Sequence, residues 1–350
     1  MADVTQEFDS ATLERFLKSR VSDLRGPMRL ERIGGGQSNP TFFVSFDNRE
    51  LVLRKQPGGA LLPAAHAVDR EARVMQALAD SALPVPQVVL FHAERDVVGT
   101  PFFVMDRVAG RVFPRCDLPG MAPEERRAIY LAMAQTMATL HQVDWQRAGL
   151  ANYGRAGGYF SRQIARWSSQ WEKSRTRENA DIEALRKWLP AHLPADESET
   201  TIAHGDFRLG NLMFHSTEPR VVAVLDWELS TLGHPLADVA FNCMAWRTLP
   251  SEYGGLRGLD LAALGIPAED EVLRHYYRAS GRRDGVTAFH FAFALFRMAV
   301  IFEGIAVRAA AGNAASADAG EVGALTSAFA PRAMEFVNGT AQVTPFEALA

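Results

Sequence analysis

Residues 204–211 read His-Gly-Asp-Phe-Arg-Leu-Gly-Asn, and the apolar residues Leu212-Met213-Phe214 follow them. A second apolar run, residues 221–225, ends directly before Asp226, which stands 20 residues after Asp206. A short apolar run of this kind is typical of a buried strand. Phosphoryl transfer needs a carboxylate that orients the attacking hydroxyl, together with oxygen ligands for Mg²⁺. The two stretches therefore predict the active site of a phosphotransferase.

The interval between Asp206 and Asn211 is five positions. The same interval separates the catalytic Asp from the metal-binding Asn in the kinase pattern H-R-D-L-x-x-x-N. An Asp followed by an Asn at this distance is common in any sequence, so the interval alone indicates little. It becomes specific when His204 precedes Asp206 by two positions and Asp226 ends the next apolar run.

The first part of the chain predicts a small antiparallel sheet and a helix. Residues 30–54 alternate between extended patterns and turns, with a Gly-rich turn at residues 34–36. A helix is expected from about Ala67 to Ala79, with Glu71 on its apolar face. A carboxylate in that position needs a cationic partner. Further extended pieces are expected at residues 87–91 and 101–105.

The cation that would bind phosphate is expected on the third strand, residues 51–55. Side chains alternate along a strand, so Arg54 and Lys55 point to opposite faces and only one can serve. Arg54 falls at the lysine position of the kinase pattern V-A-I-K, and a guanidinium can pair with both a carboxylate and a phosphate. We therefore predict that Arg54, held by Glu71, completes the catalytic group. The alternative is that both residues are solvated charges at a strand end.

A nucleotide would contact the Gly-rich turn and a later extended segment. The turn offers backbone amides to phosphate oxygens, and its predicted contacts are Gly35, Gly36, Gln37, Ser38 and Asn39. A plain hairpin turn is an equally good interpretation of three glycines. Residues 102–108 resemble the hinge of a kinase, and Met105 and Arg107 are the contacts predicted there.

The rest of the chain reads as mainly helical. Helices are expected from Pro123 to about His141, around Phe160 to Trp171, after Pro235, and from Thr287 to Ala309. His141 is expected to pack or cap rather than to act as an acid or base. Residues 309–320, rich in Ala, Gly, Ser and Asn, are expected to form a loop. The fold class is therefore α+β, with an N-terminal nucleotide-binding lobe at residues 1–107 and a C-terminal catalytic and acceptor-binding lobe at residues 108–350.

Composition narrows the class of partner. The 350 residues carry a net charge of −4, which argues against a general nucleic-acid or membrane-surface footprint. Cys116 and Cys243 form no CxxC pair, so free thiols are expected. The N-terminal residues have no apolar core of a signal peptide, and the apolar run at residues 289–302 is too short to span a bilayer. A cytoplasmic protein without nucleic-acid or membrane partners is expected, and the sequence gives no indication of oligomeric state.

Taken together, these motifs resemble the aminoglycoside phosphotransferase and choline kinase superfamily, with H-G-D-F-R-x-x-N-L-M-F followed by L-D-W-E. The ten residues from Asp226 are most similar to kinase-like domains fused ahead of certain acyl-CoA dehydrogenases. The resemblance implies the two-lobed protein-kinase-like fold, with ATP and Mg²⁺ as cofactors. It further implies Asp206 as catalytic base, Asn211 and Asp226 as metal ligands, and His204 and Asp238 as supports of the catalytic loop.

Two departures from protein kinases stand out. Gly205 replaces their Arg, and Trp227-Glu228 replaces their Phe-Gly, so an activation-loop mechanism is not supported. The small-molecule branch of the superfamily commonly has these replacements.

The expected reaction moves the γ-phosphoryl group of ATP to a hydroxyl of a small molecule. A hydroxyacyl-CoA or hydroxy acid is the leading acceptor, because basic residues near Trp167 suit an anion better than a polycationic aminoglycoside. Those residues, Arg162, Arg166, Lys173 and Arg175, can also be read as a solvated face. Three alternatives stay open: an aminoglycoside or other antibiotic kinase, a catalytically silent nucleotide-binding module, and a metal-dependent hydrolase. The hydrolase would use His204, Asp206, Asp226 and His234 as ligands.

Overall fold

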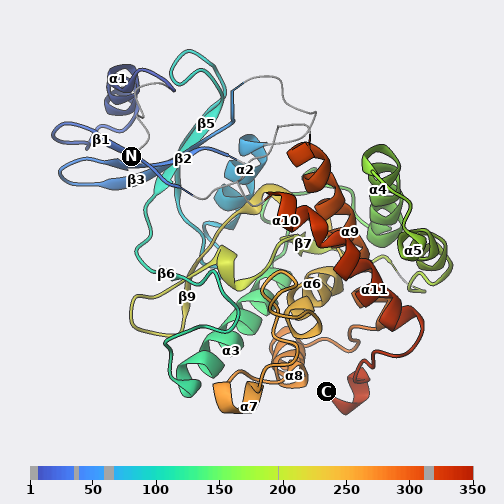
Figure 1. Cartoon of the computed structure of the whole chain (residues 1–350). Helices are drawn as coiled ribbons and strands as arrows, with labels where there is room; N and C mark the ends of the chain where they lie inside the picture. Colours follow the sequence, from blue (N-terminus) through green and yellow to red (C-terminus); the bar gives the residue numbers. More distant parts are fainter. Residues whose placement is uncertain (1–6, 35–38, 59–66, 196, 311–318, 350) are drawn as a thin grey trace. The chain divides into compact units, whose positions relative to one another are not determined.

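The computed structural model of the protein describes residues 7–34, 39–58, 67–195, 197–310 and 319–349 (Figure 1). The chain divides into two compact units. The first contains Met1–Ala109 together with Ala223–Glu228, and the second contains Gly110–Val222 and Leu229–Ala350. Residues 223–228, which the sequence analysis places in the C-terminal lobe, therefore pack within the first unit.

The first unit is built on a five-stranded antiparallel sheet in the order β1-β2-β3-β5-β4. Its strands are β1 (Arg29–Arg32), β2 (Thr41–Ser45), β3 (Glu50–Lys55), β4 (Val88–His92) and β5 (Phe102–Asp106). Its helices are α1 (Ser10–Arg20) and α2 (Val68–Leu78). The bounds of β3, α2, β4 and β5 agree with the sequence prediction to within about two residues, the usual uncertainty of element ends.

The strand β3 presents different chemistry on its two faces. Leu51 and Leu53 join the apolar cluster that also contains Leu13 and Leu17 of α1. Lys55 shares that parity, and its ammonium lies 5.8 Å from the ring centroid of Phe8. Arg54 has the opposite parity and meets Glu71 of α2. The period of two along a strand thus separates the two neighbouring cations.

The second unit is mainly helical. Its longer helices are α3 (Pro123–His141), α4 (Tyr159–Ser174), α5 (Ala180–Ala191), α6 (Pro235–Arg247), α8 (Glu269–Ser280), α9 (Ala288–Ala310) and α11 (Thr326–Val337), and α7 (Leu261–Leu264) and α10 (Ala319–Ala324) are short. Two small sheets accompany them. They contain β6 (Arg111–Val112), β8 (Leu212–Phe214) and β9 (Val221–Val224), and β7 (Thr201–Ala203) with β10 (Thr231–Gly233).

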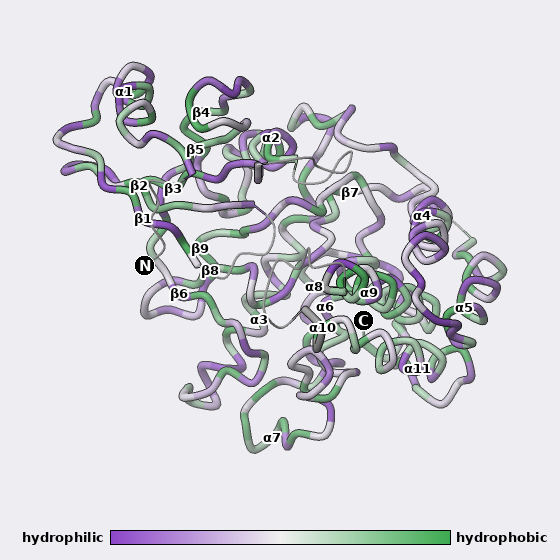
Figure 2. Tube along the Cα trace, turned by 45° about the horizontal axis from the view of Figure 1, so that its top comes forward, coloured by the Kyte–Doolittle hydropathy of each residue, from purple (hydrophilic) through white to green (hydrophobic). Residues whose placement is uncertain are grey.

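The apolar helix α9 forms the centre of the helical unit. It contacts α4, α5, α6, α10 and α11, and Figure 2 shows its hydrophobic colouring beside the mixed colouring of α4. The apolar run at residues 289–302 was expected to be too short to span a bilayer. The helix that contains it is longer, with 23 residues. Its window Ala288–Arg308 has the length and hydropathy of a span, but 78% of that window is buried, as in the core helix of a globular domain.

The loop expected at residues 309–320 is correct only in part. Ala309 and Ala310 continue α9, and Ala319 and Gly320 begin α10. Alanine favours helix, so the composition that suggested a loop also permits these extensions. Residues 311–318 lie outside the described residues.

Candidate active site

In the first unit, the guanidinium of Arg54 lies among three carboxylates. Its Nη2 donates to Oδ1 of Asp226 over 2.7 Å and lies 3.8 Å from Oε2 of Glu228. Its Nε lies 3.0 Å from Oε2 of Glu71, close enough for an ion pair although the angle is not that of a hydrogen bond. The contact predicted between Arg54 and Glu71 is therefore present, and Asp226 joins it.

Glu71 is buried on α2 and depends on two polar neighbours. One carboxylate oxygen, Oε1, accepts a hydrogen bond of 2.8 Å from Nδ2 of Asn39, and the other faces Arg54. Burial raises the pKa of Glu71 to about 8, against the opposing effect of Arg54. Burial alone would lower the pKa of Arg54, but the charges of Glu71, Asp226 and Glu228 outweigh it and raise that pKa. Without the charge of Arg54, the pKa of Glu71 would rise still further.

Asp226 has an uncommon backbone conformation. Its φ of 62° lies in the left-handed region, which residues other than glycine rarely adopt. Such conformations persist where the surroundings over-determine them, and they concentrate at functional sites. Asp226, Glu71 and Glu228 each offer one oxygen atom within 4.8 Å of the others. Glu228 was not among the predicted site residues, although it stands in the same L-D-W-E motif.

The predicted nucleotide contacts are only partly described by the structure. Gly35, Gly36, Gln37 and Ser38 lie outside the described residues, and Asn39 uses its amide to hold Glu71.

The two hinge residues do not join the Arg54 group through their side chains. Met105 is half-buried and pairs with Val52 across β3 and β5. The side chain of Arg107 pairs with Glu50 over 2.7 Å and lies over the ring of Phe43 at 4.0 Å.

In the second unit, Asn211 holds the predicted catalytic residue. Its Nδ2 donates to Oδ2 of Asp206 over 2.7 Å and to the backbone oxygen of Asp206 over 2.9 Å. Asn211 ends a short 3₁₀ turn, Leu209–Asn211, which brings residues five positions apart within reach of each other. The amide oxygen of Asn211 takes no part in these two bonds, and it is an atom type that binds Mg²⁺.

A buried carboxylate braces the start of this loop. Asp238 accepts from the backbone N–H groups of His204 over 2.6 Å and Gly205 over 2.9 Å. The backbone N–H of Asp206 in turn donates to Nδ1 of His204 over 3.2 Å. Burial alone would raise the pKa of Asp238, but hydrogen bonding and charge from His141 lead the effects that hold it below its usual value. His141 is itself buried, and its Nδ1 lies 2.7 Å from the hydroxyl of Tyr276, which fits the packed role expected for it.

Gly205 is a position where only glycine fits. Its φ is 82°, and a Cβ there would lie 2.7 Å from the backbone oxygen of Leu229. Its carbonyl oxygen accepts a hydrogen bond of 2.6 Å from Nη2 of the buried Arg297 on α9. Arg297 stands 92 residues away in the sequence, and no local pattern identified it as a support of the loop.

Arg208 connects the predicted base to a small cavity. Its Nε lies 3.3 Å from Oδ1 of Asp206, and its guanidinium lies 5.9 Å from the ring centroid of Tyr253. The cavity has a volume of about 180 Å³. Its lining is mostly apolar and includes Phe113, Cys116, Arg208, Phe241, Met244, Tyr253 and Phe329.

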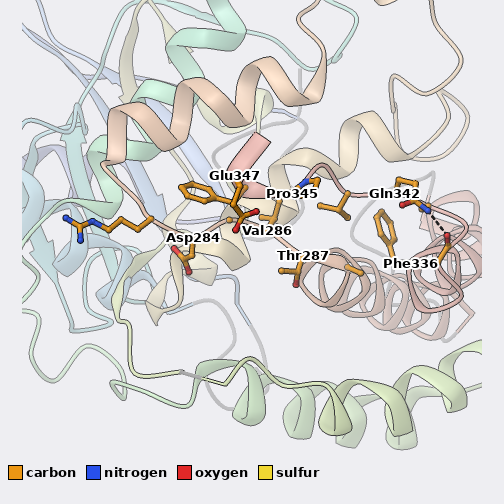
Figure 3. Close-up of a pocket in the computed structure, with 14 residues that line it drawn as sticks. Asp284, Val286, Thr287, Phe336, Gln342, Pro345 and Glu347 are labelled. Carbon is orange, nitrogen blue, oxygen red and sulfur yellow. Dashed lines mark hydrogen bonds between the residues drawn. The ribbon is translucent and has the colours of Figure 1, made fainter. Parts of the chain in front are cut away.

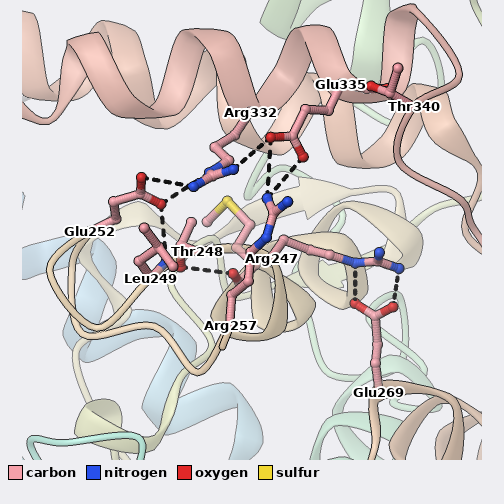
Figure 4. A network of polar contacts seen from close by, with 10 residues as sticks. Arg247, Thr248, Leu249, Glu252, Arg257, Glu269, Arg332, Glu335 and Thr340 are labelled. Carbon is pink, nitrogen blue, oxygen red and sulfur yellow. Dashed lines mark hydrogen bonds and ion pairs between the residues drawn. The ribbon is translucent and has the colours of Figure 1, made fainter. Parts of the chain in front are cut away.

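A network of ion pairs fixes the loop that carries Tyr253 (Figure 4). Glu252, next to Tyr253, pairs with Arg332 of α11 over 3.0 Å and accepts from the backbone N–H of Leu249 over 3.0 Å. Glu335 joins Arg332 to Arg257, at the far end of the same loop. The wall of the 180 Å³ cavity is therefore tied to α11 at both ends of the loop.

A second cavity, of about 550 Å³, lies between residues 283–288 and 336–347 (Figure 3). Figure 3 shows Asp284 and Glu347 among the side chains at this cavity. None of the predicted site residues lines it. It adds nothing to the argument for phosphoryl transfer.

Comparison with known proteins agrees with this arrangement. Residues 29–283 match the family model described as "Phosphotransferase enzyme family", a span that includes Arg54, Glu71, Asp206, Asn211 and Asp226. The chain belongs to this phosphotransferase family. The resemblance proposed from the motifs is therefore confirmed.

Curated proteins similar to this chain are named as members of the acyl-CoA dehydrogenase family. The mouse protein "Acyl-CoA dehydrogenase family member 10" is 43% identical over 337 residues, covering 95% of this chain and 31% of the relative. Human "Acyl-CoA dehydrogenase family member 11" is 39% identical over 321 residues, covering 89% of this chain and 41% of the relative. The chain thus spans less than half the length of these relatives.

Solved structures show the same fold. A Ralstonia eutropha protein, provisionally described as an aminoglycoside phosphotransferase, has a TM-score of 0.86 and 42% identity, covering 96% of this chain and all of that one. A mutant of aminoglycoside phosphotransferase APH(4)-Ia, in complex with AMP-PNP and hygromycin B, has a TM-score of 0.61 and 16% identity, covering 95% of this chain and 100% of that one. At 16% identity the likeness concerns the fold alone. The α+β, kinase-like fold expected from the sequence is confirmed.

Proposed function

We propose that this phosphotransferase moves the γ-phosphoryl group of Mg-ATP to a hydroxyl group of a small hydroxyacyl-CoA or hydroxy acid. The observation that carries the proposal is the hydrogen bond from Asn211 to the carboxylate of Asp206. It holds one carboxylate oxygen of Asp206 in a fixed orientation. Asp238 stabilises the start of the same loop by accepting hydrogen bonds from the backbone N–H groups of His204 and Gly205. A fixed carboxylate of this kind can orient a hydroxyl and accept its proton.

The remaining roles follow from the chemistry of the neighbouring groups. Asn211 offers an amide oxygen, and Asp226 keeps one carboxylate oxygen beyond the one that Arg54 engages, so both fit the oxygen ligands that Mg²⁺ prefers. When bound, Mg²⁺ would neutralise phosphate charge. That Asn211 and Asp226 share one metal ion remains a prediction.

Arg54 completes the proposed nucleotide site. Its guanidinium is oriented by Glu71 and Asp226, and it can pair with a phosphate while keeping a carboxylate partner. Contacts of the nucleotide with residues 35–39, Met105 and Arg107 are part of the proposal on the strength of the family resemblance. ATP as the phosphoryl donor is likewise part of the proposal on the strength of the family resemblance.

Two observations support a hydroxyacyl acceptor. The curated relatives are named as members of the acyl-CoA dehydrogenase family, and an acyl-CoA acceptor for this chain fits those names. The cavity beside Arg208 is small and mostly apolar, with a cation at one side, which suits a short acyl chain better than a polar sugar. We place the reaction in the cytoplasm, without a nucleic-acid or membrane partner, on the basis of the composition.

An aminoglycoside kinase remains compatible with the family and with the solved neighbours. Aminoglycosides are polycations, and a site for them would require acidic residues beside the base. The side chain that contacts Asp206 next to the cavity is instead the cation Arg208. This observation favours an uncharged or anionic acceptor.

The hydrolase and the silent module are less well supported. His204 and His234 each accept a backbone N–H at Nδ1, which fits supporting roles better than metal binding. A silent module commonly lacks one of the catalytic groups, whereas Asp206, Asn211 and Asp226 are all present.

The test is a screen for Mg-dependent ADP formation with pooled hydroxyl compounds. The pools contain hydroxyacyl-CoA thioesters, hydroxy acids, sugars, amino alcohols and aminoglycosides. The variant Asp206→Ala serves as the negative control, and Glu178→Gln, which alters an exposed carboxylate, serves as the matched positive control. We expect stimulation by a hydroxyacyl or hydroxy-acid pool in the wild type and in Glu178→Gln only. Stimulation by aminoglycosides alone would overturn the proposed acceptor, and failure to bind Mg-ATP would overturn the proposed reaction.

A further inference from the structure

Two arginines from different helices meet at one tryptophan in the second unit. Arg166 of α4 has its guanidinium carbon 5.1 Å from the ring centroid of Trp167, and that of Arg297 on α9 lies 5.8 Å from the same ring. Neither arginine forms an ion pair with a carboxylate among the residues that the structure describes. Two neighbouring cations without a counter-charge repel each other, and a bound anion would relieve that repulsion.

Arg297 links this pair to the catalytic loop. It is 6% exposed and lies between Trp167 and Phe241, whose ring centroid is 5.6 Å from its guanidinium carbon. Its Nη2 donates to the carbonyl oxygen of Gly205, the residue directly before Asp206. Phe241 also lines the 180 Å³ cavity beside Arg208. Arg297 therefore connects the cationic pair to the loop that carries the predicted base.

The local charge balance is positive. Burial, and then the charge of Arg297, lower the pKa of Arg166. The side chain of Arg166 is nevertheless exposed at the surface of α4, so a solute can reach it. Burial raises the pKa of the phenol of Tyr159, and the charges of Arg297, Arg166 and Arg162 oppose that rise, while Asp238 adds to it. The charges of all three guanidiniums thus act on the phenol of Tyr159.

The third arginine is already engaged. Nη2 of Arg162 donates to the backbone oxygen of Arg155 over 2.6 Å, and its Nη1 donates to that of Gly157. Glu197 is the carboxylate whose charge acts on Arg162. Arg166 and Arg297 are left as the two cations whose charge is not balanced by a described carboxylate.

We propose that Arg166 and Arg297 bind an anionic group of the phosphoryl acceptor, either a phosphate or a carboxylate. This inference rests on the proposed function and names the residues that would bind the negative charge of its acceptor. The planar fork of a guanidinium matches the geometry of both oxyanions. The face of Trp167 would support the part of the acceptor next to the charge. A polycationic acceptor would be repelled from the same place.

Binding measurements on variants test the anion site without requiring turnover. The probes are coenzyme A, which carries phosphates, and 3-hydroxybutyrate, which carries a carboxylate, each titrated by calorimetry at low and high salt. The variants are Arg166→Gln and Arg297→Lys, with Lys187→Gln as the matched control. Lys187 is an exposed cation on the neighbouring α5, and its loss removes the same charge from the protein.

We expect at least one probe to bind the wild type and Lys187→Gln equally well. Its dissociation constant should rise about tenfold in Arg166→Gln, because hydrogen bonds to charged groups are stronger than neutral ones. Binding of coenzyme A would identify phosphate as the recognised group, and binding of 3-hydroxybutyrate would identify carboxylate. High salt should weaken the interaction.

Arg297→Lys is included because Arg297 also holds Gly205, so a change of fold could imitate a loss of binding. Arg297→Lys keeps the positive charge, and we expect it to bind the probe more weakly than the wild type. The melting temperature of Arg166→Gln should equal that of the wild type, which shows that its weaker binding is not a loss of fold. The inference is overturned if neither probe binds the wild type, or if Arg166→Gln binds as tightly as Lys187→Gln. Mg-ADP binding, measured in the same samples, reports separately on the proposed function.

Discussion

Nη2 of Arg54 donates a hydrogen bond of 2.7 Å to Oδ1 of Asp226, although 172 residues separate the two in the sequence. The same guanidinium faces Glu71 through Nε. One cation thus orients the carboxylate proposed as a metal ligand and neutralises the buried carboxylate of α2. The planar fork of an arginine can serve two partners at once, which a lysine ammonium at that position cannot do with the same geometry.

Arg54→Lys tests this shared role. We expect the free energy of unfolding to fall by about 1–3 kcal/mol, because a lysine cannot keep both the charged hydrogen bond to Asp226 and the ion pair with Glu71. The KM for ATP should rise as well, since Asp226 is no longer oriented. Urea unfolding and steady-state kinetics measure the two effects. Arg29→Lys, on the exposed β1 of the same sheet, is the control, and equal behaviour of the two variants would contradict the role given to Arg54.

Asn211→Ala tests the support of the catalytic carboxylate. Removing the amide releases Oδ2 of Asp206, and a misplacement of about 1 Å can cost roughly 10²-fold in rate. We therefore expect kcat to fall by about that factor while the melting temperature changes little. Turnover of the acceptor found in the screen is the measurement. An unchanged kcat would show that Asp206 keeps its orientation without Asn211.

Asp238→Ala tests the brace beneath the loop. The backbone N–H groups of His204 and Gly205 would lose their acceptor in a fully buried place, at a cost of about 1–3 kcal/mol for each unsatisfied group. Both stability and kcat should fall. Chemical unfolding and kinetics, with the exposed Glu178→Ala as control, measure the two. Loss of stability with a normal kcat would mean that the brace does not position Asp206.

A histidine in the helical core should make stability depend on pH. Burial, followed by the charges of His234 and Arg282, lowers the pKa of His290 from 6.5 to about 3. Between about pH 3 and pH 6.5, His290 is therefore protonated in the unfolded chain but not in the folded protein. Stability should fall as the pH decreases below 6.5, by up to about 1.4 kcal/mol per pH unit from this group.

His290→Phe should weaken this dependence. A phenyl ring keeps the aromatic contact with Phe160, whose ring centroid is 5.2 Å away, but cannot take up a proton. The difference in unfolding free energy between pH 7 and pH 5 should be smaller in the variant than in the wild type. His192→Phe, at an exposed position, is the control. Identical pH profiles for the wild type and His290→Phe would exclude His290 as the source.

Local sequence patterns predicted much of the site. Alternation along β3 separated Arg54 from Lys55, and the structure places Arg54 beside Glu71 and Lys55 on the face of α1. The interval between Asp206 and Asn211 predicted a catalytic Asp and a metal-binding Asn in one loop, and the structure adds that the two side chains are hydrogen-bonded to each other. These features depend on residues that are close in sequence or on a simple strand period.

Other features depend on distant packing and could not be predicted. The bond from Arg297 to Gly205 joins residues 92 positions apart, and the amide of Asn39 turns to Glu71 because Glu71 is buried beside it. The helices α5 and α11 were not predicted, and each contains a proline inside it, at Pro190 and Pro331. Proline disfavours a helix interior, so packing against α9 overrides the local preference there.

The most direct test of the account compares the wild type with Asp206→Asn. The rate of Mg-dependent ADP formation is measured with the acceptor found in the screen, and binding of Mg-ADP is measured in parallel. We predict a loss of kcat of about 10²-fold or more with nucleotide binding unchanged, because Asp206 acts on the acceptor hydroxyl and not on the nucleotide. Turnover by Asp206→Asn at the rate of the wild type would contradict the central claim.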